Sequence, residues 1–358
     1  MTGDAAGGAA DGLARPDPRL IERAVGILAR GGLVAFPTET VYGLGADADN
    51  AAAVAAIFAA KGRPADHPVI VHVAGVEALP AWTRGDLAAA RRLAAAFWPG
   101  PLTLVLRSSA RALPVVTGGQ DTVGLRSPAH PWARALLAAW TTARGDVAAG
   151  LAAPSANRFG YISPTSAQHV REGLGEKPAG AVDLILDGGA CEFGIESTIV
   201  DLSTDLPRVL RPGAIGADRL ARVLGAAVAE EDRRLPRLAA AAPRVSGSLE
   251  QHYAPRRPLE LVAAAELPAR LAALRGRTVA VLGPAAEVGS DAESARVVLR
   301  LVAATEPTAY AHDLYRWLHQ LDASGAERIL VAAPPTTSAW LAINDRLRRA
   351  AAGTTPAD

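Results

Sequence analysis

The apolar positions of residues 17–36 repeat first with the spacing of a helix and then as a continuous run. Asp17 before Pro18 is typical of a helix start, and the glycines at 31–32 are typical of its end. Between them one face of the expected helix is apolar, formed by Ile21, Ala24, Val25 and Leu28. The apolar run at 33–36 predicts a strand, and the polar, glycine-containing stretch at 37–49 predicts turns.

Short helices and strands alternate from there to about residue 224. A helix is expected from near Asn50, with Val54, Ile57 and Phe58 buried, and another over 86–97. Apolar runs at 69–73, 102–106 and 123–125 predict further strands. This mixture indicates an α/β sheet domain.

The pattern breaks at 230–245, where charges, prolines and alanines follow no sustained period, and this stretch is predicted to be a linker. Beyond 258, strands at 259–262, 278–282 and 329–332 alternate with helices near 267–274, around Trp317 and around Leu347. We therefore expect a disordered tail (1–16), a larger α/β domain (17–225), a linker or lid (226–257) and a small doubly wound, Rossmann-like α/β domain (258–350).

Composition narrows the possible partners. The chain has 358 residues and 37 Lys and Arg against 36 Asp and Glu, so it lacks the basic excess of a protein that grips a long nucleic-acid backbone. Its single cysteine, Cys191, excludes an internal disulfide and a multi-cysteine metal cage, and is consistent with the cytoplasm. The first 15 residues do not resemble a signal peptide, and the alanine-rich stretch at 51–60 is too short to span a membrane.

The most informative motif follows the first strand and reads PTETVYGLG at 37–45. Its threonine hydroxyls, including that of Thr40, and its glycines suit a small polar ligand, and loops at strand ends are where α/β proteins place such contacts. An ordinary hydrogen-bonded turn would have the same composition. The motif is not a dinucleotide fingerprint, because it lacks the third glycine and the immediate helix.

Lys61 and Arg63 lie in a KGRP sequence at the end of the second expected helix. Cations at this position commonly complement a helix C-terminus. The alternative is a phosphate clamp, since Lys and Arg are the side chains that neutralise a triphosphate. The sequence contains no Walker loop, so an ATP site here would depend on side-chain cations.

Other candidate residues lie at strand ends and turns. His72 falls on the strand face opposite Val71, although a lone histidine there is usually structural, and the histidines lack metal-ligand spacing. Arg126 and Arg211 each end an apolar stretch, where a guanidinium can fork onto an anion or form a surface ion pair. The turns at 153–157 and 163–165 are individually weak signals. Tyr253, next to His252 in the linker, either closes over a ligand or packs against the nearer domain.

Taken in order, these motifs resemble the threonylcarbamoyl-adenylate synthase family: PTETVYGLG, KGRP, a strand with His, TVGLR, APSAN, SPT, STIVD, RPG and HYAP. The first domain resembles the YrdC type, a twisted mixed sheet with helices, and the whole chain resembles the two-domain long form. The resemblance assigns the L-threonine side of the site to Thr40, His72, Arg126, Ser155 and Ser197. It assigns the ATP side to Lys61, Arg63, His67, Thr122, Asn157, Ser163, Thr165, Arg211 and Tyr253. His67 stands where the family usually has Asn, and 245–251 lacks the Pro-Gly-Met and basic residues often found before His-Tyr.

The resemblance also implies a reaction. L-threonine, bicarbonate and ATP, the last with Mg²⁺, would give threonylcarbamoyl-AMP and pyrophosphate, with Lys61 and Arg63 as the catalytic cations and no protein-bound metal. The product would pass to a threonylcarbamoyl-transferring complex that modifies tRNA, without stable nucleic-acid binding by this chain and without a membrane. Two alternatives stay open: an RNA-binding module of YrdC type, and the carbamoyl-adenylate former of hydrogenase maturation, which normally carries extra cysteines and acylphosphatase segments.

Overall fold

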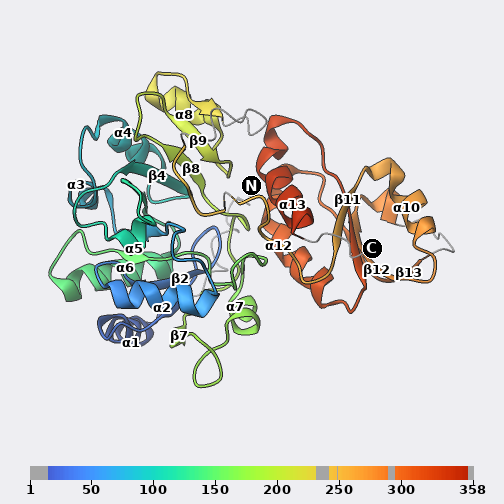
Figure 1. Ribbon diagram of the computed structural model, residues 1–358, viewed down its shortest axis with the longest axis horizontal. Coiled ribbons are helices and arrows are strands. Elements are labelled where there is room, and N and C mark those ends of the chain that lie inside the picture. The colour runs from blue at the N-terminus through green and yellow to red at the C-terminus, as the bar shows by residue number, and fades with distance from the viewer. Residues whose placement is uncertain (1–14, 231–241, 248, 289–294, 354–358) are drawn as a thin grey trace, which may run out of the picture.

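The computed structural model describes residues 15–230, 242–247, 249–288 and 295–353. They form two α/β domains side by side, the larger coloured blue to yellow and the smaller orange to red (Figure 1). The larger domain contains, in chain order, α1 (Pro18–Ala29), β1 (Val34–Phe36), β2 (Gly43–Asp47), α2 (Ala51–Lys61), β3 (Ile70–His72), η1 (Val76–Ala78), α3 (Leu79–Trp82), α4 (Ala88–Phe97), β4 (Leu102–Arg107), α5 (Pro114–Thr117), β5 (Thr122–Arg126), α6 (Pro131–Arg144), β6 (Leu151–Ala152), α7 (Ala167–Gly173), β7 (Leu184–Ile185), β8 (Thr198–Asp201), β9 (Arg208–Arg211), α8 (Ala217–Leu224) and β10 (Ala229–Glu230).

The sheet of the larger domain mixes parallel and antiparallel strands in the order β10-β9-β8-β4-β5-β3-β6-β2-β1-β7. Two apolar cores cover it. One contains Leu104, Val71 and the inner residues of α2 and α4, and the other packs α1 and α6 against β1 through Trp132 and Trp140. The predicted twisted mixed sheet with helices is therefore confirmed.

The two caps of α2 set the ends of the helix that leads into the KGRP sequence. Asn50 caps α2 by accepting hydrogen bonds from the amides of Ala52 and Ala53, as its position before the apolar stripe predicts. The helix ends at Gly62, which has a left-handed φ of 62° that favours glycine. This sharp turn sends the chain back toward the sheet and brings Lys61 and Arg63 into the interior, where both are buried.

The sequence-based boundaries needed correction in three places. The stretch 37–49 is not all turn, because β2 pairs antiparallel with β1, and Gly45 lets the Phe36 ring lie where any Cβ would be only 2.7 Å away. The helix expected from 86 begins at Ala88. The strand β10 pairs with β9 inside the expected linker, so the ordered first domain extends to Glu230. Most of the predicted tail (1–14) and residues 231–241 lie outside the described residues.

The smaller domain contains β11 (Leu259–Val262), η2 (Ala264–Glu266), α10 (Leu267–Ala273), β12 (Thr278–Gly283), α11 (Ala285–Val288), β13 (Arg296–Val302), α12 (Pro307–Ala323), β14 (Arg328–Ala332), η3 (Ser338–Trp340) and α13 (Leu341–Ala352). Its strands are parallel in the order β11-β14-β12-β13. Helices α10 and α11 pack on one face and α12 and α13 on the other, as expected for a doubly wound domain. The edge strand β13 was missed, because its side chains are all partly or fully exposed and include two arginines.

The two domains share an apolar cluster. Helices α12 and α13 face the larger domain (Figure 1), and their buried side chains pack with Val41, Ile162, Ile195 and Tyr253. The interface is thus continuous with the core of the smaller domain, and it lies beside the motif loops of the larger one. Nowhere in the described part of the chain is a helix both long enough and apolar enough to cross a bilayer.

Candidate active site

One enclosed pocket, called the site pocket here, lies in the larger domain beneath the linker. Its wall is assembled from chain segments that are far apart in sequence, and its free volume is about 40 Å³. The residues that line it are Thr38, Val41, Gly43, Arg63, Ile70, His72, Arg126, Ala153, Pro154, Ser155, Glu196, Ser197, Arg211, Ser246, Gly247, His252 and Tyr253. Seven of the residues singled out from the sequence are therefore brought together: Arg63, His72, Arg126, Ser155, Ser197, Arg211 and Tyr253.

Three buried guanidinium groups converge on this pocket. Burial lowers the pKa of Arg63 to about 10 and lowers that of Arg211 as well. The Arg63 guanidinium donates to the Pro68 carbonyl at 2.7 Å and to the Ser246 hydroxyl at 3.3 Å. Arg211 donates to the Ser197 carbonyl at 2.9 Å and to the Ser246 carbonyl at 3.0 Å. These hydrogen-bond partners are neutral oxygens, and the Glu196 carboxylate, which lies near Arg211, is itself hydrogen-bonded to Arg346. This side of the pocket is therefore electrostatically prepared for a further anion.

The third guanidinium has a carboxylate partner. Arg126, at the end of β5, donates to Glu39 Oε1 at 2.7 Å and to the Gly100 carbonyl at 3.3 Å. The second carboxylate oxygen of Glu39 accepts from the Ala129 amide at 2.9 Å. The pair is almost fully buried. Arg126 is thereby held in one orientation at the pocket wall, which is the condition for recognising a carboxylate by geometry.

Lys61 is buried directly behind the pocket. Its Nζ donates to the main-chain oxygens of Ser155 and Asn157, each at 2.5 Å, and so fastens the loop that carries Ser155. Burial, together with the neighbouring Arg63, lowers the Lys61 pKa well below its usual range. The position of Lys61 supports the loop, and the phosphate contact expected of it stays a prediction.

His72 contributes a neutral imidazole. Burial, with a further contribution from Arg126, lowers its pKa to about 3. At neutral pH the ring therefore carries no charge and donates or accepts hydrogen bonds. Its position beside Phe36, ring edge to face at 6.1 Å, fixes its orientation on β3.

Several buried polar atoms around the pocket have no hydrogen-bond partner among the described residues: Arg63 Nε, His72 Nδ1, Asn157 Oδ1, His252 Nδ1 and Tyr253 OH. Buried polar groups are normally paired, and leaving one unpaired costs about 1–3 kcal/mol. That several such atoms gather at one place indicates that a polar ligand supplies the missing partners.

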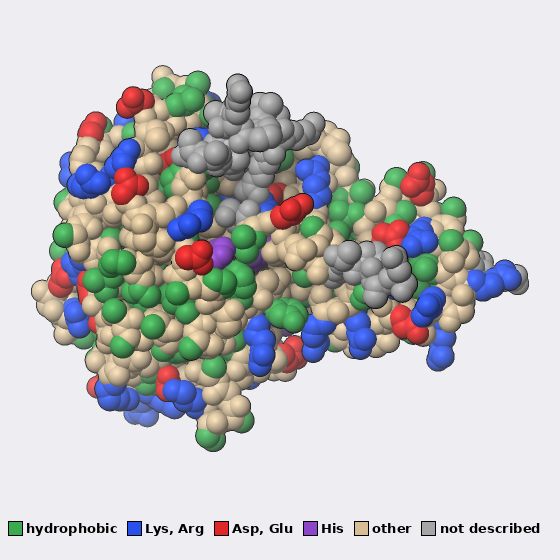
Figure 2. All heavy atoms as spheres, viewed as in Figure 1, with side chains coloured by type: hydrophobic (Ala, Val, Ile, Leu, Met, Phe, Trp, Pro, Cys, Tyr) green, Lys and Arg blue, Asp and Glu red, His purple; other side chains and the backbone are tan. Residues whose placement is uncertain are grey.

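The linker closes the pocket through Tyr253. This residue is buried and adopts a φ of 62°, a left-handed conformation that costs a bulky side chain about 1–2 kcal/mol. Its ring packs against that of His252 at 4.1 Å and lies under Arg346 of the smaller domain, 5.5 Å away. Burial raises the pKa of its hydroxyl far above the usual range. Both domains thus hold the strained linker over the pocket. Figure 2 shows that little of any histidine side chain is exposed on this face of the molecule.

The remaining candidates lie one layer behind the pocket or beside it. The hydroxyl of Thr40 pairs with that of Thr38 at 2.8 Å, and Ser163 donates to Glu196 at 2.6 Å. Asn157 donates to the carbonyls of its own loop. Thr122 lines a smaller adjoining cavity that shares Ile70 and Ser246 with the site pocket. Thr165 is buried against His169. His67 packs on Phe159, with ring centroids 5.3 Å apart.

Sequence reasoning gave no role to three residues: Glu196 and Ser246, which line the pocket, and Glu39, which is bonded to Arg126. Glu39 lies inside PTETVYGLG and Glu196 directly precedes STIVD, but nothing in the sequence indicates that they pair with Arg126 and Arg346. Ser246 carried no signal either, because its contacts with Arg63 and Arg211 span 183 and 35 residues of sequence.

Two family models match consecutive parts of the chain. Residues 26–213 match the family described as telomere recombination, and residues 215–352 match the threonylcarbamoyl-AMP synthase C-terminal domain. Threonylcarbamoyl-AMP synthase of Bacillus subtilis is 38% identical over 355 residues, covering 96% of each chain. The same enzyme of Pyrococcus abyssi is 38% identical over 347 residues, covering 92% of this chain and 93% of its own. The crystal structure of P. abyssi Sua5 complexed with L-threonine superposes with a TM-score of 0.81 at 34% identity, covering 95% of this chain and 96% of that one.

The fold, the pocket and these relatives together define a two-domain enzyme of the nucleotidyltransferase type. The chain belongs to the threonylcarbamoyl-AMP synthase family. The resemblance drawn from the motifs is therefore confirmed. The relatives are enzymes, which favours the enzyme over the RNA-binding alternative.

Proposed function

We propose that this protein converts L-threonine, bicarbonate and ATP into threonylcarbamoyl-AMP and pyrophosphate within the site pocket. The threonine amine first takes up CO2, supplied by bicarbonate, as a carbamate. A carbamate oxygen then attacks the α-phosphorus of ATP, and pyrophosphate leaves with the bonding electron pair. The observation that carries this proposal is the meeting of three buried guanidinium groups and several unpaired polar atoms around one enclosed pocket.

Arg126 defines the threonine side. Its guanidinium, fixed by Glu39, presents a fork that suits the threonine carboxylate. The hydroxyls of Thr40, Ser155 and Ser197 and the neutral His72 ring suit the amine, hydroxyl and carbamate of the substrate. The P. abyssi relative was crystallised with L-threonine, which supports threonine as the substrate.

Arg63 and Arg211 define the nucleotide side. Both are buried, and neither has a carboxylate as its nearest hydrogen-bond partner, so the triphosphate would provide the compensating charge. Lys61 would use its third N–H toward the phosphates while it holds the Ser155 loop with the other two. Stabilising developing phosphate charge and aligning the reacting atoms account for catalysis without a nucleophilic side chain.

Mg²⁺ would arrive with ATP. The described residues contain no group of three or more His, Cys, Asp and Glu side chains that could hold an ion. We propose that this Mg²⁺ is held mainly by phosphate oxygens and water, where it would neutralise phosphate charge.

The linker would exclude water. The free volume of about 40 Å³ is far below what ATP needs, and is room for about three water molecules. ATP binding therefore requires displacement of 246–247 and 252–253, and their return would protect a carbamate that is labile in water.

We further propose that the product serves tRNA threonylcarbamoyladenosine modification through a transferring complex, and that the chain works in the cytoplasm, consistent with its buried free thiol Cys191.

The test is incubation of the full chain with Mg·ATP, labelled bicarbonate and single amino acids. We expect an adenylate and pyrophosphate that both depend on threonine, and neither with Arg63→Met. Exposed Arg91 provides the matched control, because Arg91→Met should retain wild-type turnover. A wild-type protein that binds neither ATP nor threonine, or that releases pyrophosphate without threonine, would refute the proposal.

A further inference from the structure

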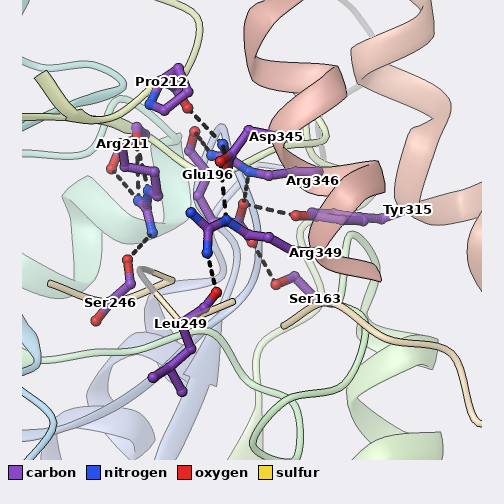
Figure 3. Close-up of polar contacts among 11 residues, drawn as sticks. Ser163, Glu196, Arg211, Pro212, Ser246, Leu249, Tyr315, Asp345, Arg346 and Arg349 are labelled. Atoms are coloured by element: carbon purple, nitrogen blue, oxygen red, sulfur yellow. Dashed lines mark hydrogen bonds and ion pairs between the residues drawn. The ribbon is translucent and has the colours of Figure 1, made fainter. Parts of the chain in front are cut away.

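A buried ionic cluster joins the smaller domain to the wall of the site pocket (Figure 3). Arg346, on α13, is completely buried and its Nε donates to Glu196 Oε2 at 3.0 Å. Tyr315, on α12, donates to the same oxygen at 2.8 Å, and Ser163 donates to Oε1 at 2.6 Å. The carboxylate of a pocket residue thus receives two of its three side-chain hydrogen bonds from the other domain.

Arg346 also reaches the second strand of the pocket wall. Its Nη1 donates to the Pro212 carbonyl at 2.7 Å. Pro212 follows Arg211, and Glu196 precedes Ser197, so one guanidinium ties together the two chain segments from which Ser197 and Arg211 enter the pocket. Ser197 directly precedes β8, and Arg211 is the last residue of β9. These two strand ends are adjacent because β8 and β9 pair antiparallel.

The charges explain why a cation is needed at this place. Burial raises the pKa of Glu196, but the charges of Arg346 and Arg211 and the Ser163 hydrogen bond outweigh it and bring the pKa to about 2, so the group stays ionised. Without Arg346, Arg211 would be the cation among the described residues that acts on this buried carboxylate. The carboxylate would then draw Arg211 away from a phosphate and repel the phosphate itself.

We propose that Arg346 is a positioning residue for the nucleotide side of the site pocket, and that the smaller domain completes this site by neutralising Glu196 and holding Ser197 and Arg211 in place. The inference rests on the proposed ATP-dependent reaction. It gives the smaller domain a function beyond anchoring the linker, because the domain supplies the charge that leaves Arg211 free for the nucleotide.

The experiment compares full-length Arg346→Met, Glu196→Gln and the double variant by equilibrium binding of a non-hydrolysable ATP analogue and by KM for ATP and for threonine. Arg346→Met is expected to weaken the analogue and raise KM for ATP roughly tenfold, while KM for threonine changes much less. Adding Glu196→Gln removes the uncompensated charge and should restore most of the ATP affinity. Arg346→Lys, which keeps the charge but not the fork, should fall between wild type and Arg346→Met.

The matched control is Arg256→Met, which removes a more exposed ion pair between the end of the linker and the smaller domain, that of Arg256 with Asp322 at 2.8 Å. It should leave both KM values unchanged. The inference is overturned if Arg346→Met binds the analogue like wild type, or if the double variant is as weak as Arg346→Met, which would mean that the residue only supports folding. Wild-type turnover is measured in parallel, so a wild-type protein that makes no adenylate refutes the proposed function instead.

Discussion

Glu39 and Arg126, 87 residues apart in sequence, form a buried ion pair with 2.7 Å between Oε1 and Nη2. Glu39 lies between the two threonines of its loop, and Arg126 ends a strand in the middle of the sheet. The pair therefore ties the most distinctive motif of the chain to the residue assigned to the substrate carboxylate. Breaking it affects both the orientation of Arg126 and the packing of the loop.

Glu39→Gln should weaken threonine selectively. The amide keeps the size of the side chain and can still accept from the Ala129 amide, but it loses the charge that orients Arg126. We expect KM for threonine to rise about tenfold, equivalent to about 1.4 kcal/mol, with KM for ATP nearly unchanged. Glu22→Gln on the exposed face of α1 is the control. Equal losses for both substrates would contradict a carboxylate-orienting role.

Lys61→Ala and Arg63→Ala should differ in stability although both abolish pyrophosphate release. Lys61 satisfies two buried carbonyls, so its removal should lower the free energy of unfolding by about 2–4 kcal/mol. Arg63 contacts the linker and a single loop carbonyl, and its loss should cost about 1 kcal/mol. Pyrophosphate release and urea unfolding of both variants measure this. If pyrophosphate release persists in either variant, the phosphate-clamp assignment is wrong.

The sequence predicted the parts of this protein that depend on local pattern. Capping residues and apolar stripes located α1 and α2, and strand ends located Arg126 and Arg211. The motif order identified the family, and half of the candidate residues line one pocket. Strand β2 was missed, because its glycines were interpreted as turn residues. In the structure, Gly45 makes room for the Phe36 ring.

Partners distant in sequence could not be predicted. Arg346 looks like any cation in the middle of an amphipathic helix, and only the packing of α13 on the larger domain buries it beside Glu196, 150 residues earlier. Ser246 likewise gains its contacts only when the linker folds back over the site pocket. Periodicity reports which face of an element is apolar, not which distant polar group it will meet.

Tyr253→Phe should separate stability from nucleotide affinity. The hydroxyl is buried with no partner among the described residues, so its removal should leave the free energy of unfolding unchanged or raise it by about 1 kcal/mol. If the Tyr253 hydroxyl forms a hydrogen bond with the nucleotide, the rise in Tm that ATP produces should be smaller in the variant. Melting curves with and without Mg·ATP test this, with Tyr310→Phe, another buried unpaired tyrosine, as control. An unchanged ATP effect would exclude a hydroxyl–nucleotide contact.

Protonation of a stacked histidine pair should loosen the domain interface at acidic pH. The rings of His169 on α7 and His319 on α12 stack at 3.8 Å across the two domains. Burial lowers the pKa of both from 6.5 to about 4, with a further contribution to His169 from His319. Between these values the unfolded chain binds more protons than the folded one, so the free energy of unfolding is at its full value above about pH 6.5 and falls as the pH drops toward 4.

His319→Gln removes one of these groups and should therefore flatten the decline. Other buried histidines with lowered pKa values, His72 and His252, remain in the variant, so its stability still falls with acid, but less steeply than in wild type. Urea unfolding of both proteins at intervals from about pH 7 to about pH 4.5 gives the two slopes. The difference between the curves should open only below about pH 6.5, where the unfolded imidazole begins to charge. Parallel curves through this range would show that His319 binds protons equally in the folded and unfolded chain, and that the stack is not sensitive to pH.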